Sequence, residues 1–535
     1  MNTKRLKRRL KNLMYQKADA TKVLLSMVFI VLVFVPLICV FAAIDLPTLR
    51  SVVTSAGFGA SIGHSLTAAS LTTVIVVVLA YVLAMCTERV SMRMKALFGI
   101  IFALPMLIPS VSHGMGLVLL LGNNGLLTRA LGIDVSLYGL PGIVMGSVLY
   151  ALPVAYLMIV DVMKYEDGAP HEAANVLGIP AWRRFARITL PYLKKPMLNV
   201  VFATFTLVIT DYGVPLMVGG KYTTIPVVMY QEVIGQLNFG KGAVYGSLLL
   251  IPALAAFVID LLNQEHGKSA VTRKPMRRSE NRGAKLAAYT ACSAAAVYML
   301  LPILAFIVLA FVRQYPGDLS FSLNNVTAAL NLRAGQYLSN SVIIALAVSV
   351  IGVGVSFFTA YMAARMPSRT SRFLHLSAIS SAAIPGVVLG LAYVLCFKGT
   401  PVYGTLAILI MVNTVHFIAS PYLMMYNSLG KLNPNVENVG HTLGVSRIHI
   451  ILDVVLPLCR GTLAEMFAYF FVNSMMTISA VSFLATTANK PVSLMINQFE
   501  AQMQLSCAAV VSLMILLVNL GLKGLVPLMK RKWRR

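Results

Sequence analysis

Long apolar segments separated by short polar ones run the whole length of the chain. Segments of about 20 residues, the length that a helix needs to cross a bilayer, lie near 23–42, 62–86, 97–121, 139–163, 197–218, 242–262, 287–311, 341–364, 373–397, 402–426, 463–485 and 506–529. Runs of this length are typical of helices and exceed barrel strands. The pattern therefore predicts an all-α polytopic membrane protein with about twelve transmembrane helices.

The composition agrees with a membrane protein. The 535 residues are 58% hydrophobic and 12% charged, with a mean hydropathy of +0.80, whereas soluble domains devote about a quarter of their residues to charge. Soluble, disordered and fibrous classes are therefore excluded. Six cysteines are scattered without a CxxC pair, so we expect buried small apolar side chains, with no disulfide framework and no metal site.

The distribution of basic residues predicts the orientation in the membrane. The net charge is +26, from 44 Lys and Arg against 18 Asp and Glu. With a cytoplasmic N-terminus, only eight of the 44 fall in outer loops: Arg50, Arg129, Lys221, Lys241, Arg313, Arg333, Lys398 and Lys490. Basic loops stay inside, against anionic lipid. We therefore expect a multi-pass cell-membrane protein with both termini cytoplasmic, and membrane lipid instead of nucleic acid as the partner of its charge.

The spans divide into two similar halves. Residues 263–286 form a polar, basic stretch that separates the spans six and six. Around it, Tyr156-Leu-Met matches Tyr422-Leu-Met, and Leu190-Pro191 matches Leu456-Pro457, at the same offset of 266. We expect two tandem domains, 1–262 and 287–535, joined by a cytoplasmic linker at 263–286 and related by an axis along the membrane normal.

One loop in each half carries a helix–break–helix pattern, near 164–195 and near 430–461. In the first, Gly178 suits the left-handed end of a short helix. Pro180 suits the opening of a second short helix, and we expect Pro191 to help end it. The small residues Ala173 and Ala174 leave room for another surface to approach, so the loop is suited to docking.

The first of these loops resembles the EAA loop of type I ATP-binding-cassette (ABC) import permeases. Every fixed position of that motif is present: Glu172, Ala173, Ala174, Gly178, Ile188, Leu190 and Pro191. The second copy is less regular, with Asn438, Gly440, Gly444, Leu456 and Pro457 in the pattern and Glu437 one position early. The likeness covers nearly the whole chain, because two fused six-span halves resemble the fused permeases for ferric iron, thiamine or 2-aminoethylphosphonate.

The resemblance implies partners that this chain does not contain. Each loop would bind one of two copies of a cytoplasmic ATP-hydrolysing subunit, and an extracytoplasmic binding protein would deliver the solute. The phosphate-binding pattern G-x-x-x-x-G-K-[ST] is absent from the sequence. We therefore expect no enzyme activity and no cofactor in this chain, with ATP and Mg²⁺ bound by the partner subunits.

Interrupted spans mark a candidate solute pathway. Pro109 and Gly114 in the third span match Pro385 and Gly390 in the ninth, each pair being five residues apart. Ordinary helix kinks in a packed bundle remain the alternative. Asp211, beside Tyr212, lies deep in its span. A carboxylate there must face a cavity or a partner, so Asp211 either lines the pathway or is a satisfied structural group.

The stretch 210–220 resembles most closely permeases for 2-aminoethylphosphonate, and ferric iron, polyamine and thiamine are the alternatives. The expected mechanism is alternating access, in which closure of the ATP-hydrolysing subunits moves the two halves between inward-open and outward-open forms. An ion-gradient-driven carrier is a rival, but it needs intramembrane carboxylates, and only Asp211 sits deep. A membrane-embedded enzyme is a weaker rival, because the spans show no nucleophile–base constellation.

Overall fold

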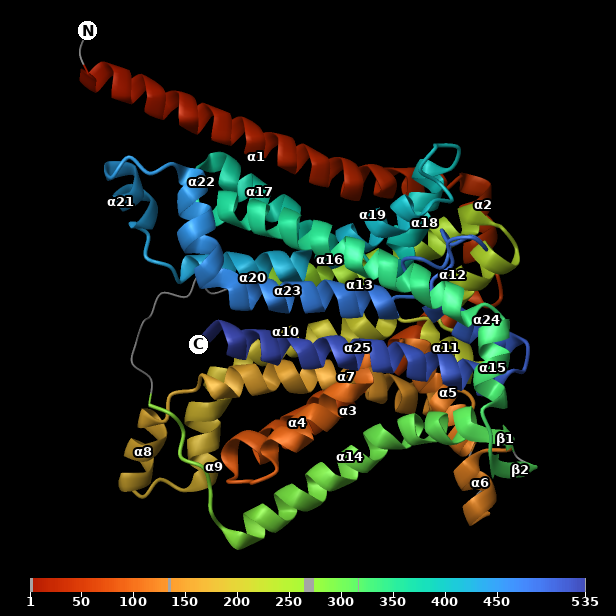
Figure 1. Ribbon diagram of the computed structural model, residues 1–535. Coiled ribbons are helices and arrows are strands. Elements are labelled where there is room, and N and C mark those ends of the chain that lie inside the picture. The colour runs from red at the N-terminus through yellow and green to blue at the C-terminus, as the bar shows by residue number, and fades with distance from the viewer. Residues whose placement is uncertain (1–2, 133–135, 264–273, 316, 535) are drawn as a thin grey trace. The chain divides into compact units, whose positions relative to one another are not determined.

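The computed structural model describes residues 3–132, 136–263, 274–315 and 317–534 (Figure 1). The chain is 79% helical with almost no strand, which confirms the all-α membrane fold. The described strands form a short antiparallel hairpin, β1 (Val312–Gln314) and β2 (Asp318–Phe321), with Val312 opposite Phe321. Residues 264–273 of the expected linker lie outside the described residues.

Among the described residues, eight single helices are long and apolar enough to cross a membrane. Three more candidate spans consist of two helices that meet at a sharp bend, 95–131 by 102°, 369–397 by 104° and 406–430 by 51°. Together these account for eleven of the twelve expected spans. The twelfth, 463–485, corresponds to α23 (Leu456–Met476), which falls outside that set and ends where Thr477 turns to an extended conformation.

The chain folds into two compact units, named here by their largest segments. The 46–334 unit also includes residues 495–516. Its helices are α2 (Leu46–Val53), α3 (Phe58–Arg89), α4 (Lys95–Ala103), η1 (Leu104–Leu107), α5 (Ser110–Leu121), α6 (Leu126–Leu131), α7 (Leu140–Lys164), α8 (Ala169–Val176), α9 (Ala181–Arg184), η2 (Phe185–Thr189), α10 (Leu190–Ile209), α11 (Gly213–Val218), α12 (Ile225–Tyr230), η3 (Gln231–Gly235), α13 (Phe239–Asn263), α14 (Arg282–Phe311), α15 (Asn324–Asn331) and α24 (Met495–Ala501).

The 335–494 unit also includes residues 1–45 and 517–535. Its helices are α1 (Thr3–Ala42), α16 (Ala334–Arg365), α17 (Arg369–Ile379), η4 (Ser380–Ala383), α18 (Gly386–Phe397), α19 (Leu406–Phe417), α20 (Ala419–Gly430), α21 (Val436–Thr442), α22 (Arg447–Ile450), η5 (Ile451–Val455), α23 and η6 (Val492–Leu494). The long helix α25 (Leu505–Arg534) begins in the 46–334 unit and ends in this one.

In the 46–334 unit, α3 packs on α7 and α10, and α5 packs on α7, α11 and α14. The core is close-packed: the Phe102 ring meets the edge of Tyr156 at 5.1 Å between centroids. Helix α14 approaches α5 so closely that a Cβ on Gly116 would lie 2.6 Å from the Cβ of Pro302. The hydroxyl of Tyr298 in α14 donates to the Met145 carbonyl at 2.6 Å.

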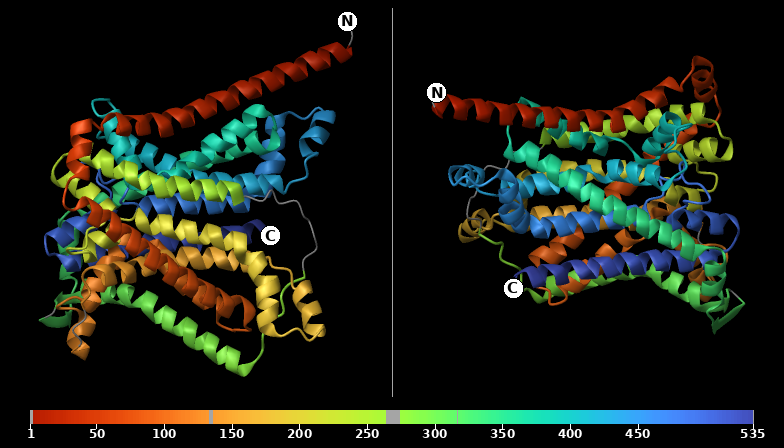
Figure 2. Two further views of the ribbon diagram at one scale, coloured as in Figure 1. Left: turned by 180° about the vertical axis from the view of Figure 1, so that it is seen from behind. Right: turned by 45° about the horizontal axis from the view of Figure 1, so that its top comes forward.

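In the 335–494 unit, α1 runs alongside α17 and α18 (Figures 1 and 2). The Tyr393 hydroxyl of α18 donates to the Leu32 carbonyl of α1 at 2.9 Å. Thus α1 packs with the later repeat of the sequence, whereas α14, the first span after the linker, packs with the earlier repeat. The expected domains 1–262 and 287–535 follow the order of the repeats along the chain. In the compact units, the first helix of each repeat belongs instead to the unit that contains the other repeat.

Besides the span expected at 463–485, which ends at Met476, two expected helix ends were wrong. The span expected at 197–218 ends at Ile209, because the chain turns at Thr210 and starts the separate short helix α11. Pro191 does not end a helix. It lies in the first turn of α10, and the chain is helical from Ala181 to Ile209. Proline is tolerated at that position because a first-turn N–H needs no intrahelical acceptor.

Candidate functional site

The two predicted loops fold into the same structure, named here the first elbow (residues 169–189) and the second elbow (residues 435–455). In the first elbow, Gly178 has a φ of +68° and separates α8 from α9. In the second, Gly444 has a φ of +73° and separates α21 from α22. Both values lie in the left-handed region, where glycine has no steric cost.

Each first helix ends in a Schellman motif. The Ile179 N–H donates to the Ala174 carbonyl and the Val445 N–H donates to the Gly440 carbonyl, both at 2.9 Å. Gly440 has a second role, because a Cβ there would lie 2.3 Å from Cδ1 of Ile450. Glycine at this position therefore lets α21 pack directly on α22.

The second helix of each elbow opens differently and continues in the same way. Pro180 is the N-cap residue of α9, one position before the expected opening, whereas the Ser446 hydroxyl caps α22. Each then widens into a π-helical turn, η2 or η5, which runs without a break into α10 or α23. These turns start at Phe185 and Ile451, which are separated by the repeat offset of 266.

The motif residues divide into buried and exposed sets. Ala174 is buried, Ile188 and Leu456 are half-buried, and Ala173, Asn438, Leu190, Pro191 and Pro457 are exposed. Thus Ala173 is open to an approaching surface, whereas Ala174 is not. Around the glycines lie large exposed apolar side chains: Val176, Leu177, Trp182, Leu443 and Ile448. Clustered exposed apolar surface is characteristic of a protein-binding site.

A buried ion pair attaches the residues just before the first elbow to α3. The Glu166 carboxylate pairs with Arg89, the last residue of α3, and lies 2.9 Å from Nε2 of His171. The Glu166 side chain is buried. The motif glutamate, Glu172, takes no part in this pair and contacts the ammonium of Lys274 at the surface.

The described end of the linker binds to the same region. The Gly168 N–H donates to the Lys274 carbonyl at 2.8 Å. Farther along, the Ser279 N–H donates to the Arg89 carbonyl at 2.7 Å, and Ser279 accepts from the Ser91 N–H at 3.0 Å. Residues 274–279 therefore lie against both the first elbow and the end of α3.

The second elbow is attached to α16 through the glutamate that departs from the motif. Nε of Arg365, the last residue of α16, donates to Oε1 of Glu437 at 2.8 Å. The same guanidinium donates to the carbonyls of Leu432 and Asn433 at 3.1 and 2.8 Å. Burial by itself raises the pKa of Glu437, but the hydrogen bonds and charge of Arg365 outweigh it and hold that pKa below its usual range.

Sequence reasoning missed both ion pairs. An available signal was the arginine that ends each of α3 and α16, because a charge at a span terminus needs water or a partner. Its partner could not be identified from the sequence, since Glu166 precedes the first elbow whereas Glu437 lies inside the second.

The broken helices expected as a pathway are present in both units. Pro109 and Pro385 are the N-cap residues of α5 and α18, where the chain bends by 102° and 104°. A Cβ on Gly114 would lie 3.2 Å from the Val214 carbonyl oxygen, and one on Gly390 would lie 2.7 Å from the Ala480 carbonyl oxygen. Because Val214 and Ala480 are separated by 266 residues, the broken helix of each unit packs against corresponding backbone.

Asp211 is held at the start of α11. Its carboxylate accepts the N–H groups of Gly213 and Val214 at 3.3 and 3.0 Å, together with a hydrogen bond from Ser110 at the start of α5. It also borders a cavity of about 10 Å³, beside Ser65 and Thr224, which is the space that one water molecule needs. The geometry thus combines a satisfied carboxylate with a small polar cavity.

The neighbouring Tyr212 is fully buried and stacks on Tyr230 at 4.8 Å between ring centroids. Within the described ranges, no group of three or more His, Cys, Asp or Glu side chains is arranged to hold a metal ion. The candidate site therefore consists of the two elbows, their arginine attachments and the broken helices.

Comparison with known proteins gives the family context for these features. Residues 80–264 and 352–535 each match the family described as "Binding-protein-dependent transport system inner membrane component". A putative ferric transport system permease of Haemophilus influenzae is 28% identical over 436 residues, covering 75% of this chain and 66% of the relative. A ferric transport system permease of Actinobacillus pleuropneumoniae is 25% identical over 449 residues, covering 79% and 64%.

The chain therefore spans slightly less than two thirds of the length of these two relatives. The thiamine transport system permease of Escherichia coli is 24% identical over 434 residues, covering 78% of both chains. The two family matches begin 272 residues apart and each contains one elbow, so the family similarity follows the internal repeat.

Proposed function

We propose, because this chain belongs to the family of binding-protein-dependent transport system inner membrane components, that it is the membrane-spanning permease of an ABC importer. The observation that carries the proposal is the repeated elbow: the same Schellman motif, left-handed glycine and π-turn recur 266 residues apart. A local structure that recurs in this detail, with its apolar residues exposed, is suited to binding the same partner twice.

The partner we propose is a cytoplasmic ATP-hydrolysing subunit, one copy at each elbow, with ATP and Mg²⁺ bound to that subunit. The exposed side chains Leu177, Trp182, Leu443 and Ile448 supply the contact surface. Burial of one leucine of this kind stabilises a complex by roughly 1.5–3 kcal/mol. Cytoplasmic elbows require both termini of the chain to be cytoplasmic as well, as the distribution of basic residues predicts.

The proposed mechanism is alternating access. Each elbow continues directly into α10 or α23, and the segment after that helix contacts the glycine of a broken helix, Gly114 or Gly390. Movement of an elbow is therefore transmitted along one helix to the broken span of the same unit. An extracytoplasmic binding protein delivers the solute to the other side of the membrane.

For the solute, we propose ferric iron as the first candidate, because the names of two relatives that cover three quarters or more of this chain refer to ferric transport. Thiamine is named for a third relative. The stretch 210–220 favours 2-aminoethylphosphonate as a second candidate, since it resembles permeases for that solute. It also contains Asp211, which accepts a hydrogen bond from Ser110 at the start of α5, and Tyr212, the N-cap residue of α11.

The test is uptake by proteoliposomes that contain this chain, its ATP-hydrolysing subunit and its binding protein. We expect uptake that requires ATP and survives an ionophore. Uptake without ATP that collapses with an ionophore would instead identify an ion-gradient-driven carrier. The solute is identified beforehand by the shift in melting temperature of the binding protein with ferric iron, thiamine or 2-aminoethylphosphonate. Cysteine labelling at Val176 and Leu443 from each side of the membrane checks the orientation.

A further inference from the structure

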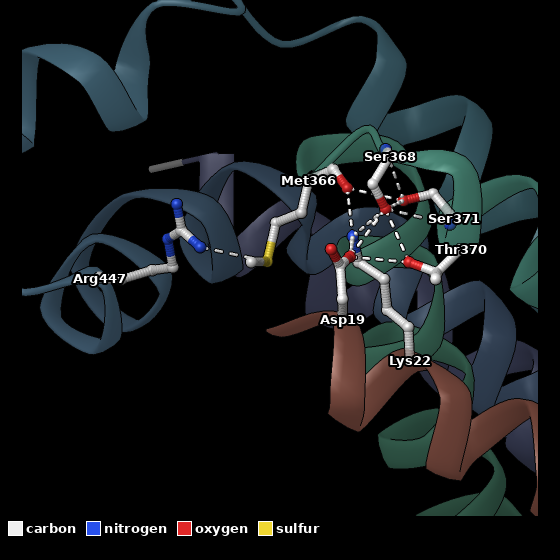
Figure 3. Close-up of polar contacts among 7 residues, drawn as sticks. All are labelled: Asp19, Lys22, Met366, Ser368, Thr370, Ser371 and Arg447. Carbon is white, nitrogen blue, oxygen red and sulfur yellow. Dashed lines mark hydrogen bonds and ion pairs between the residues drawn. The ribbon is translucent and has the colours of Figure 1, made fainter. Parts of the chain in front are cut away.

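One lysine of α1 is buried on a helix whose other faces are largely exposed. Lys22 is 2% exposed, whereas Leu24 and Met27 on the same helix are 65% and 53% exposed. A buried ammonium is stable only with hydrogen-bond partners. The Lys22 ammonium has three: it donates to the Met366 carbonyl at 2.6 Å, to the Ser368 hydroxyl at 2.8 Å and to the Asp19 carboxylate at 3.1 Å (Figure 3).

Two of these partners, Met366 and Ser368, belong to the turn that joins α16 to α17, named here the 365–368 turn. Because α16 ends at Arg365, the Met366 carbonyl lacks an intrahelical donor, and Lys22 supplies one. Ser368 is the N-cap of α17 and forms a capping box with Ser371.

Asp19 completes the arrangement from the same helix. Its Oδ1 accepts hydrogen bonds from Ser368 at 2.9 Å and Thr370 at 2.7 Å (Figure 3). A cation at the C-terminus of one helix and an anion at the N-terminus of the next both oppose the helix dipoles. Two residues of α1, one helical turn apart, therefore stabilise both ends of the 365–368 turn.

The other side of the same turn contacts the second elbow. Arg365 binds Glu437 in α21, and Arg447 in α22 donates to the Met366 sulfur at 3.2 Å (Figure 3). The turn also begins α17, the first arm of the broken helix that bends by 104° before α18. It therefore lies between α1, both helices of the second elbow and the broken helix that contains Gly390.

We propose that Asp19 and Lys22 are positioning residues that set the coupling between the second elbow and the broken helix α17–α18. By holding the 365–368 turn against α1, they make that turn a fixed point, so movement of the elbow is passed into α17 instead of being absorbed in a loose loop. This inference rests on the proposed function, since it assigns a coupling role within the importer.

In the 46–334 unit, a different segment holds the turn that contacts the elbow. The corresponding turn after α3 is held by backbone hydrogen bonds to Ser279, which lies just before α14. In each unit, therefore, the exchanged helix or the residues leading into it reach the turn that contacts the elbow. The contacts of Lys22 among the described residues lie in the 335–494 unit, so we expect its substitution to leave the Arg89–Glu166 attachment in place.

The experiment uses the full chain reconstituted with its ATP-hydrolysing subunit and binding protein, and it measures solute molecules imported per ATP hydrolysed. Lys22→Met keeps the length and apolar stem of the side chain but removes its charge and donors. We expect the ratio to fall about fivefold or more, while ATP hydrolysis continues. Lys22→Arg restores a charged donor and is expected to recover most of the ratio.

The matched control is Lys530→Met. Lys530 is a lysine of the long helix α25 in the part that belongs to the same unit, and it pairs with Glu465 away from the turn. Its substitution is expected to leave the ratio unchanged. Equal ratios for Lys22→Met and Lys530→Met would overturn the inference, whereas a wild-type chain without ATP-dependent uptake would overturn the proposed function itself.

Two further variants separate coupling from folding. Thr370→Ala removes one hydrogen bond to Asp19 and is expected to lower the ratio in the same direction by a smaller factor; if Lys22→Met fails to insert, an unchanged ratio for Thr370→Ala overturns the inference. In the double variant Lys22→Met with Glu437→Gln, a shared route through the turn predicts a loss no larger than the greater single loss. Losses that multiply independently contradict that route.

Discussion

The left-handed glycines of the two elbows allow the most direct prediction. Gly178 and Gly444 have φ values of +68° and +73°, and an added Cβ at either position meets no atom within 4 Å. Substitution by alanine therefore introduces no steric contact and costs only the left-handed conformation, about 1–2 kcal/mol. A cost of that size lowers the population of the elbow conformation about 5–30-fold. Asparagine tolerates the left-handed region and costs less, whereas a β-branched valine costs more.

The assay is retention of the ATP-hydrolysing subunit on the purified permease at several subunit concentrations. We expect retention to fall in the order Gly, Asn, Ala, Val at each position. Because each glycine sets the conformation of its own elbow locally, the double alanine variant should show the sum of the single free-energy costs, about 2–4 kcal/mol. Equal retention by the asparagine and valine variants, or full retention by the double alanine variant, would refute the argument from backbone conformation.

Gly390→Ala places a Cβ 2.7 Å from the Ala480 carbonyl oxygen and is expected to lower the unfolding free energy by about 1–3 kcal/mol. The control is Gly354→Ala on α16, where an added Cβ meets no atom within 4 Å. We expect this control to be neutral or stabilising in thermal unfolding. The pKa of Glu437 is depressed, so its pairing with Arg365 stabilises the fold above the usual carboxyl pKa of about 4.3. This stabilisation is lost as the pH falls below that value. The difference in melting temperature between wild type and Glu437→Gln should therefore vanish in acid. The exposed contact of Lys274 with Glu172 stabilises by no more than about 1 kcal/mol. Lys274→Ala and Arg277→Ala, a control at an exposed arginine of the same segment, should therefore differ by less than about fivefold in affinity for the ATP-hydrolysing subunit.

The features predictable from the sequence are local ones. The elbow is encoded within about twenty residues by a glycine that permits a left-handed turn, a residue that caps the second helix and apolar side chains at helical spacing. The bends at Pro109 and Pro385 were also predictable, because proline interrupts a helix at its own position in the chain. Helix ends were less predictable: Thr210 and Thr477 end helices inside apolar runs that hydropathy alone would continue.

The attachments of the elbows were not predictable, because they join residues far apart in the chain. Arg365 and Glu437 are separated by 72 positions, and Lys22 and Met366 by 344. A single lysine near the start of an apolar run is also what the positive-inside rule produces. Its burial against the 365–368 turn therefore carries no signal of its own in the sequence.

The sequence by itself determined the membrane class, the repeat at an offset of 266 and the conformation of both elbows, since each follows from apolar run length or from single residues acting locally. Only the tertiary structure decided that α1 packs with the later repeat and α14 with the earlier one. Lipid tails and helix faces are equally apolar, so hydropathy marks which residues leave water but not which helix they pack against. That choice depends on close backbone approach and on a few buried polar contacts, such as Gly116 against Pro302 and Lys22 on the 365–368 turn.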